Sequence, residues 1–118
     1  MKQSIITNER VHTRVTNLIA SKIKGAVSIF SNAPTVNVED GGGWYKTIIV
    51  KNEDFHMLTF AEIDIVREVV DEYCKKYKGM FYIMGCTPYV SRFDNETVLY
   101  MPSMEINVRK YDKDEVEK

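Results

Sequence analysis

The chain has 118 residues, of which 44% are hydrophobic and 28% are charged, and its formal net charge is −1. This length suits one domain with a modest core, and the composition excludes a fibrous repeat and wholesale disorder. No apolar run approaches the roughly 20 residues that span a bilayer, and residues 1–9 lack the apolar core of a secretory signal. We therefore expect one intracellular domain over residues 1–118, without a membrane partner and with a charged, frayed tail from 112 to 118.

The first predicted helix runs from about Asn8 to Lys24, where apolar residues recur at helical spacing and either Thr7 or Asn8 can cap the start. Gly25 is expected to end this helix, because glycine readily adopts the left-handed conformation of a helix stop. Residues 26–30 then fit either a further helical turn or a short strand. The expected inward positions of the helix are Val11, Val15, Leu18, Ile19 and Ile23.

Two strands are predicted next, at residues 35–39 and 44–51, because polar and apolar side chains alternate in both. In the second strand Ile48 and Val50 share one face. The glycine-rich residues 40–43 between the strands form a hairpin turn. A phosphate-binding glycine loop opens onto a helix, whereas this one opens onto a strand, so a flexible hairpin tip is the favoured interpretation.

The clearest local signal opens a second helix that is expected to run to about Tyr77. Thr59 and Glu62 have the spacing of a capping box, in which each side chain accepts a hydrogen bond from the backbone of the other. Leu58 and Ile63 are placed to close a hydrophobic staple across this cap. Gly79 follows as a left-handed stop.

The remaining chain is rich in strand-forming residues. Residues 80–84 are predicted to form a strand that residues 85–88 break, and residues 97–101 and 104–111 are predicted to form two more. Pro102 cannot donate to a strand ladder, so a bulge or an edge position is expected there. The sequence therefore predicts an α+β fold with two helices packed on one face of a mostly antiparallel sheet, in the order α-β-β-α-β-β with room for one more strand.

No constellation of residues predicts catalysis, and we expect no enzyme activity, no cofactor and no metal. Asp54 and His56 share a face if their segment is extended, but a general acid and base pair there is weakly supported. A metal site would require the fold to gather residues that are scattered along the chain. The residues concerned are His12, His56, Cys74, Cys86 and Asp54. With two cysteines only, reduced thiols are favoured over a disulfide.

Charge is distributed unevenly along the chain. Residues 1–30 carry five basic side chains and one acidic, whereas residues 31–72 carry three basic and nine acidic. Opposite charges on one molecule suit a head-to-tail contact between copies, although each helix simply having a solvated charged side is the alternative. Trp44 and Tyr45 are either core at the base of the hairpin or an anchor for a partner. The predicted interface residues are Trp44, Tyr45, Arg10, Arg14, Glu68, Asp71 and Glu72.

The order of helix, strand 34–38, strand 44–50, long helix, polar hairpin around residues 92–96 and final strand resembles small tail-completion or tail-terminator proteins of tailed bacteriophages. The resemblance covers most of the chain in topology and patterning, although the first hairpin turn is shorter than in that family. It implies a virion structural protein that forms a ring, typically a hexamer, where head and tail join after assembly in the host cytoplasm.

The leading hypothesis is therefore a non-enzymatic homo-oligomer that also contacts other structural proteins. The alternative is a small soluble binding module, either an inhibitor or a nucleic-acid-binding accessory protein. Nucleic acid is possible but not favoured as a partner, because the isoelectric point is near 6.1 and the sequence contains no aromatic motif of an RNA-binding sheet.

Overall fold

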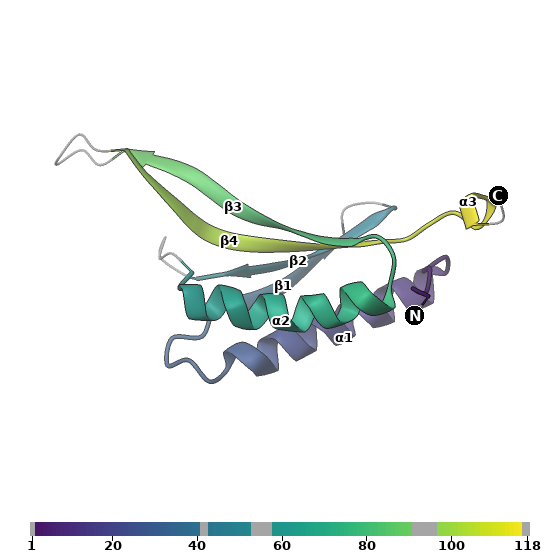
Figure 1. The fold of residues 1–118 in the computed structure, drawn as a ribbon, viewed down its shortest axis with the longest axis horizontal. Helices are drawn as coiled ribbons and strands as arrows, with labels where there is room; N and C mark the ends of the chain where they lie inside the picture. Colours follow the sequence, from purple (N-terminus) through teal and green to yellow (C-terminus); the bar gives the residue numbers. More distant parts are fainter. Residues whose placement is uncertain (1, 41–42, 53–57, 91–96, 117–118) are drawn as a thin grey trace.

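Two long helices lie on one face of a four-stranded antiparallel sheet, in which the strand order is β1-β2-β4-β3 (Figure 1). The computed structural model describes residues 2–40, 43–52, 58–90 and 97–116, and for 82–90, 97–102 and 115–116 it describes the backbone alone. The predicted α+β fold is confirmed. The elements are α1 (Glu9–Val27), β1 (Thr35–Asp40), β2 (Tyr45–Lys51), α2 (Phe60–Lys76), β3 (Met80–Val90), β4 (Thr97–Arg109) and the four-residue α3 (Lys113–Val116).

The core lies between this sheet and the two helices. Side chains on the central strands alternate in burial, so that Ile48 and Val50 of β2 face the helices, as predicted. On the sheet face away from the helices, the Thr47 hydroxyl of β2 donates to the side-chain oxygen of Asn107 on β4 over 2.8 Å. The apolar side chains with 0% exposure in the described part of the chain are Ile19 and Ile23 from α1, Val70 from α2, Ile48 and Val50 from β2, and Met104, Ile106 and Val108 from β4.

Helix α1 begins as predicted but ends later. The Asn8 side chain caps it by accepting from the backbone nitrogens of Arg10 and Val11, at 2.8 and 3.2 Å. The prediction that Gly25 ends the helix is wrong, because the helix continues to Val27, whose side chain is buried. Burial of a valine side chain contributes about 1.5–3 kcal/mol, which outweighs the cost of roughly 1 kcal/mol for an internal glycine.

The buried face of α1 also differs from the predicted one. Leu18 is 46% exposed, whereas the polar His12 and Thr16 are fully buried. Both polar side chains have hydrogen-bond partners that permit burial: the Thr16 hydroxyl donates to the His12 carbonyl over 2.7 Å, and the His12 ring bonds the Val108 carbonyl. The inward stripe is therefore rotated away from Leu18.

Helix α2 follows its local signals closely. The Glu62 backbone nitrogen donates to the Thr59 hydroxyl over 3.1 Å, and the Thr59 nitrogen donates to the Glu62 carboxylate over 2.8 Å, which confirms the capping box. Leu58 and Ile63, the predicted staple residues, are both buried in the core. Gly79 has a φ of +84°, the left-handed conformation predicted for the stop.

Strands β3 and β4 are longer than predicted. Residues 85–88 do not break β3, which continues to Val90, and β4 passes through Pro102 as a single strand to Arg109. The register shifts once, because two residues of β4 lie opposite one residue of β3 between the pairs Gly85↔Ser103 and Thr87↔Tyr100. This shift is the bulge expected at Pro102, and it lets the strand continue past a residue without a backbone donor.

Some predictions fall outside the described residues. Among them are the centre of the glycine turn at residues 41–42, the pair Asp54 and His56, and the polar hairpin around residues 92–96. Among the residues that are described, no helix has both the length and the apolar character needed to cross a membrane.

Candidate interaction surfaces

The outer halves of β3 and β4 extend beyond the sheet. Strand β2 pairs with β4 only between Ser103 and Arg109, and its last pair joins Lys51 to Ser103. Residues 86–90 of β3 and 97–102 of β4, here called the arm, pair with each other and with no other described strand. In Figure 1 the arm extends past the ends of both long helices, and the molecule measures 57 × 29 × 24 Å. A two-stranded ribbon without a third layer is only marginally stable in water.

The exposed charges of the two helices differ in balance: α1 is mostly basic, whereas α2 carries four acidic residues beside the exposed basic Arg67, Lys75 and Lys76. The helices run in opposite directions side by side (Figure 1), and the predicted interface residues on both are exposed. Within the described part of the chain no ion pair joins the basic set to the acidic set. The exposed basic residues of α1 are Arg10, Arg14, Lys22 and Lys24, and the exposed acidic residues of α2 are Asp64, Glu68, Asp71 and Glu72.

Two of these acidic residues also line an open groove beside the last turns of α2. The groove is bordered by Gln3, Asp71, Glu72, Cys74, Lys75 and Lys76. The Gln3 side chain donates to the Cys74 carbonyl, which ties the N-terminal segment to the end of the helix. Burial raises the pKa of the Cys74 thiol, so this free cysteine is held in its neutral form. The groove therefore offers charged contacts without an activated nucleophile.

Trp44 lies just before β2, and Tyr45 is the first residue of that strand. Trp44 is 46% exposed, which excludes it from the core, and its carbonyl accepts from the Lys110 nitrogen over 2.7 Å. Tyr45 is half-buried and packs edge to face against Phe81, with ring centroids 5.7 Å apart. This pair lies on the sheet face opposite the helices, where no other described element packs (Figure 1).

Two apolar side chains are exposed at the end of the helical layer from which the arm extends. Phe60 is the first residue of α2 and is 82% exposed, and Ile29 follows the end of α1 and is 73% exposed. Because the helices run in opposite directions, the end of α1 and the start of α2 lie together below the arm (Figure 1). Neither residue was singled out from the sequence, because a helix terminus breaks the periodic pattern that marks exposed positions.

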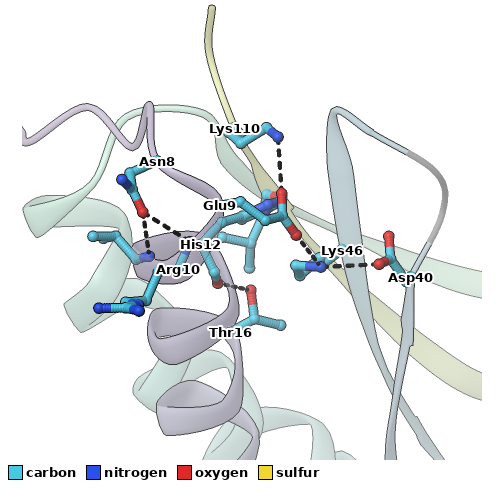
Figure 2. A network of polar contacts seen from close by, with 10 residues as sticks. Asn8, Glu9, Arg10, His12, Thr16, Asp40, Lys46 and Lys110 are labelled. Carbon is cyan, nitrogen blue, oxygen red and sulfur yellow. Dashed lines mark hydrogen bonds and ion pairs between the residues drawn. The ribbon is translucent and has the colours of Figure 1, made fainter.

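A cluster of charges fastens the other end of α1 to the sheet (Figure 2). Lys46 points toward α1 from the inner face of β2, and its Nζ lies 2.9 Å from Glu9 Oε1 and 3.0 Å from Asp40 Oδ2. Lys110 Nζ lies 2.8 Å from the other Glu9 oxygen. The hydrogen bonds from Lys110 and Lys46 lower the pKa of Glu9 to about 2. Each charge has an opposite partner, so the cluster is suited to holding elements together.

His12 lies beside this cluster (Figure 2). Its Nε2 donates to the Val108 carbonyl over 2.6 Å, and Nδ1 has no hydrogen-bond partner among the described residues. Burial lowers the pKa of His12, because a charged imidazolium loses its hydration in the core. The ring is fully buried and has no path to a substrate. In the described ranges, no three His, Cys, Asp or Glu side chains are gathered as they would be around a metal ion.

The described geometry therefore consists of a strand edge with no described neighbour, two charged helix surfaces and exposed apolar residues at the base of the arm. Comparison of the chain with protein-family models, with curated proteins and with solved structures finds no match.

Proposed function

We propose that this protein is a non-enzymatic structural protein that assembles into an oligomeric ring, as a tail-completion or neck component of a phage virion does. The arm is the observation that carries the proposal. Residues 97–102 present a strand edge that pairs with no other described strand. Such an edge is a template for pairing with another chain. Pro102 and the bulge beside it interrupt the edge at its inner end, so residues 97–101 are its continuous part.

The charges support self-assembly over a foreign partner. The exposed surface of α1 is mostly basic, and that of α2 carries four acidic residues beside the basic Arg67, Lys75 and Lys76. A contact between α1 of one copy and the acidic positions of α2 of another brings opposite charges together. A contact that joins two different surfaces of identical chains is heterologous, and it forms a ring when the rotation closes. Assembly would take place in the host cytoplasm and persist in the virion.

The test compares the mass in solution of the natural chain with that of an arm-shortened variant, in which Asn-Gly replaces residues 86–102. Light scattering after size-exclusion chromatography should give several times 13.7 kDa for the natural chain and a monomer for the variant. The variant should keep its thermal unfolding midpoint, because the buried core residues of the described part lie outside the deleted segment. A natural chain that stays monomeric at millimolar concentration contradicts the proposal, as does a shortened chain that assembles normally.

A binding module is the second candidate, and the pair Tyr45 and Phe81 favours it. Phe81 is 41% exposed on the uncovered sheet face, where an aromatic ring is available to stack on a base or a side chain. The neighbouring charges are mixed, since Arg109 and Lys51 share this face with Glu105. Titration with single-stranded RNA at two salt concentrations tests this alternative, because binding to phosphates weakens steeply as salt rises.

A further inference from the structure

We propose that the outer edge of β1 pairs with β1 of a second copy of the chain, so that two sheets join into one. The strands run antiparallel across a two-fold axis, with Asn37 of one copy opposite Asn37 of the other. The contact is isologous, because both copies contribute the same surface. It goes beyond the proposed ring, whose contacts are heterologous, and it joins one ring to another.

Strand β1 lies at the margin of the sheet. Its residues Thr35–Asp40 all pair with β2, and no other described strand pairs with it. The described backbone hydrogen bonds outside the regular elements involve none of residues 35–39. The N–H and C=O groups that point away from β2 are therefore a template for another strand.

Two links near β1 fall outside the described residues, and the positions of their ends keep them from its outer edge. Residues 41–42 lie within the short β1–β2 hairpin. Residues 53–57 connect Asn52 to Leu58, and the Asn52 amide donates to Glu62 in the first turn of α2 over 3.3 Å. Both ends of this second link are therefore at the start of α2, which packs on α1 and β3. The outer edge of β1 lies beyond β2 from there.

The side chains of β1 select the register. Because opposite residues of a sheet share a face, a two-fold axis through the sheet sets odd residues against odd and even against even. With Asn37 opposite itself, Val36 of each copy lies beside Val38 of the other on the helix side. The alternative, with Val38 opposite itself, would set Val36 against the charged Asp40.

The two valines of β1 are incompletely covered within one chain. Val38 is 39% exposed and Val36 is half-buried, although both pair with buried residues of β2. Pairing of two copies brings four valine side chains together across the new strand pair. Burial of their apolar surface and the cross-strand contacts favour the joined sheet.

Charge on the other face of the sheet indicates that the occupant is a second copy. Lys51 is exposed at the end of β2 and pairs with Thr35. The proposed register sets Glu39 of the second copy opposite Thr35, in line with Lys51. The two charged residues are then two strand spacings apart, about 10 Å at their backbones, and their long side chains can meet above the threonine. In the described part of the chain neither has an ion-pair partner, and the new pair forms twice about the axis.

The contact is weak between single chains and gains strength by repetition. It involves only residues 35–39 of each strand, and the mostly basic α1 helices of the two copies lie on the same side of the joined sheet, where like charges oppose each other. Between two rings the contact repeats for each subunit, and such multivalency raises its effective strength. Single chains should therefore pair through β1 only at high concentration.

A disulfide at the two-fold axis tests the pairing in the full chain. With Asn37→Cys, the two introduced cysteines face each other at a Cα separation that a disulfide can bridge. Incubation with oxidised glutathione at millimolar protein concentration, followed by trypsin, should give peptide 25–46 linked to its own copy. Trypsin releases this peptide by cleavage after Lys24 and Lys46. A peptide linked to its own copy can arise only between two chains.

Thr35→Cys is the matched control, because it lies on the same strand and the same face as Asn37. In the proposed register its two copies are four residues apart along the strands, about 13 Å, so it should link at least about tenfold more slowly. Equal rates in the two variants overturn the register. Absence of self-linkage through Asn37→Cys, or linkage only to Cys74 or Cys86, overturns the inference.

Charge reversal on the Asn37→Cys background tests the recognition of a second copy. Lys51→Glu alone and Glu39→Lys alone should each slow the linkage by about three- to tenfold, because each sets like charges side by side twice. The chain with both changes should link at the original rate, since the pair is restored with its signs exchanged. A double variant that links as slowly as the single variants would show that these two side chains do not meet, against the proposed register.

The outcomes for the ring and for the β1 contact are separable. A natural chain that reaches only a dimer, while Asn37→Cys links to its own copy, contradicts the ring and keeps the β1 contact. A natural chain that forms a larger assembly without this linkage keeps the ring and overturns the β1 contact.

Discussion

His12 illustrates at the scale of one residue how the fold controls a charge. Its ring is fully buried and donates to the Val108 carbonyl, so a second proton on Nδ1 would place a charge in the core. Burial is the main cause of its lowered pKa, and the nearby Lys46 and Lys110 lower it further. The Val108 hydrogen bond and Glu9 raise the pKa but do not reverse the direction.

This environment predicts that the free energy of unfolding falls as the pH drops below about 6.5. The pKa of histidine in the unfolded chain is near 6.5, and the pKa of folded His12 is lower, so the unfolded state binds more protons in between. The contribution of neutral His12 to the free energy of unfolding is fully present above pH 6.5, and it is lost as the pH falls through the pKa of the folded state. Urea unfolding of the natural chain and of His12→Gln at pH 7.5 and 5.0 measures it.

The variant should lose part of the pH dependence, because glutamine keeps a donor for Val108 but does not titrate. The contribution of Glu9 to stability is fully present above pH 4.5 and is lost only as the pH falls from 4.5 to about 2, below this window. His56 is present in both chains and cancels in the comparison. An equal loss of stability in the two proteins would show that His12 is not the group responsible.

Sequence periodicity did not predict the burial of His12, Thr16 or Lys46. Because each side chain is polar, the sequence pattern predicts that it is exposed. Each is nevertheless buried, because its polar atoms bond to a group that is distant in sequence or to a carbonyl in the same helix. His12 meets a carbonyl 96 residues away, and Glu9 meets Lys110 across 101 residues. Such partners depend on how the strands are arranged, whereas periodicity reports only on neighbours within one element. The exposure of Arg10, Arg14, Glu68, Asp71 and Glu72 was easier to predict, since long charged side chains are rarely buried.

Element boundaries were predictable where the signal is local. The capping box of Thr59 and Glu62 and the stop at Gly79 depend on residues within a few positions of each other. Residue 25 is a glycine as well, but helix α1 continues through it because burial of the Val27 side chain favours another turn. Glycine in the sequence therefore marks an opportunity for a stop, and packing decides whether the chain takes it.

The two glycines should respond in opposite ways to alanine. Gly25→Ala should raise the free energy of unfolding by about 0.5–1 kcal/mol, because the position is helical and no atom lies within 4 Å of the added Cβ. Gly79→Ala should lower it by more than about 1 kcal/mol, because φ is +84° and the added Cβ lies 2.6 Å from the Tyr111 hydroxyl. Urea denaturation of both variants checks this. Similar effects at the two sites would contradict the assignment of helix and stop.

At the scale of the whole molecule, stability and the proposed assembly depend on different parts of the chain. Among the described residues the core lies between the helices and the inner part of the sheet, whereas the arm adds backbone pairs beyond it. The sequence predicted a strand at residues 97–101 of the arm but a break at residues 85–88, and it did not predict that the arm lies outside the sheet. The arm lies outside the sheet because the pairing of β2 ends opposite Ser103. No property of residues 97–102 themselves encodes where a neighbouring strand ends.

The opposite charges of α1 and α2 lead to a prediction about the complete assembly. Reversal of the basic face with Arg10→Glu and Arg14→Glu should weaken self-association by roughly three- to tenfold, because it places acidic faces against each other. Reversal of the acidic face with Glu68→Lys and Asp71→Lys should have the same effect. A chain carrying all four changes should recover most of the lost affinity, since the two faces are complementary again.

Sedimentation velocity at 0.1 M and 1 M salt measures these affinities. The self-association of the natural chain and of the fourfold variant should be weaker at 1 M salt, where charges are screened beyond about 3 Å. Lys2→Glu is the matched control, because it reverses an exposed charge that lies outside both helix faces, and it should leave assembly unchanged. If the fourfold variant instead loses as much binding free energy as the two double variants lose together, the helix faces do not meet. Strand pairing through the arm would then have to hold the subunits together without help from the helices.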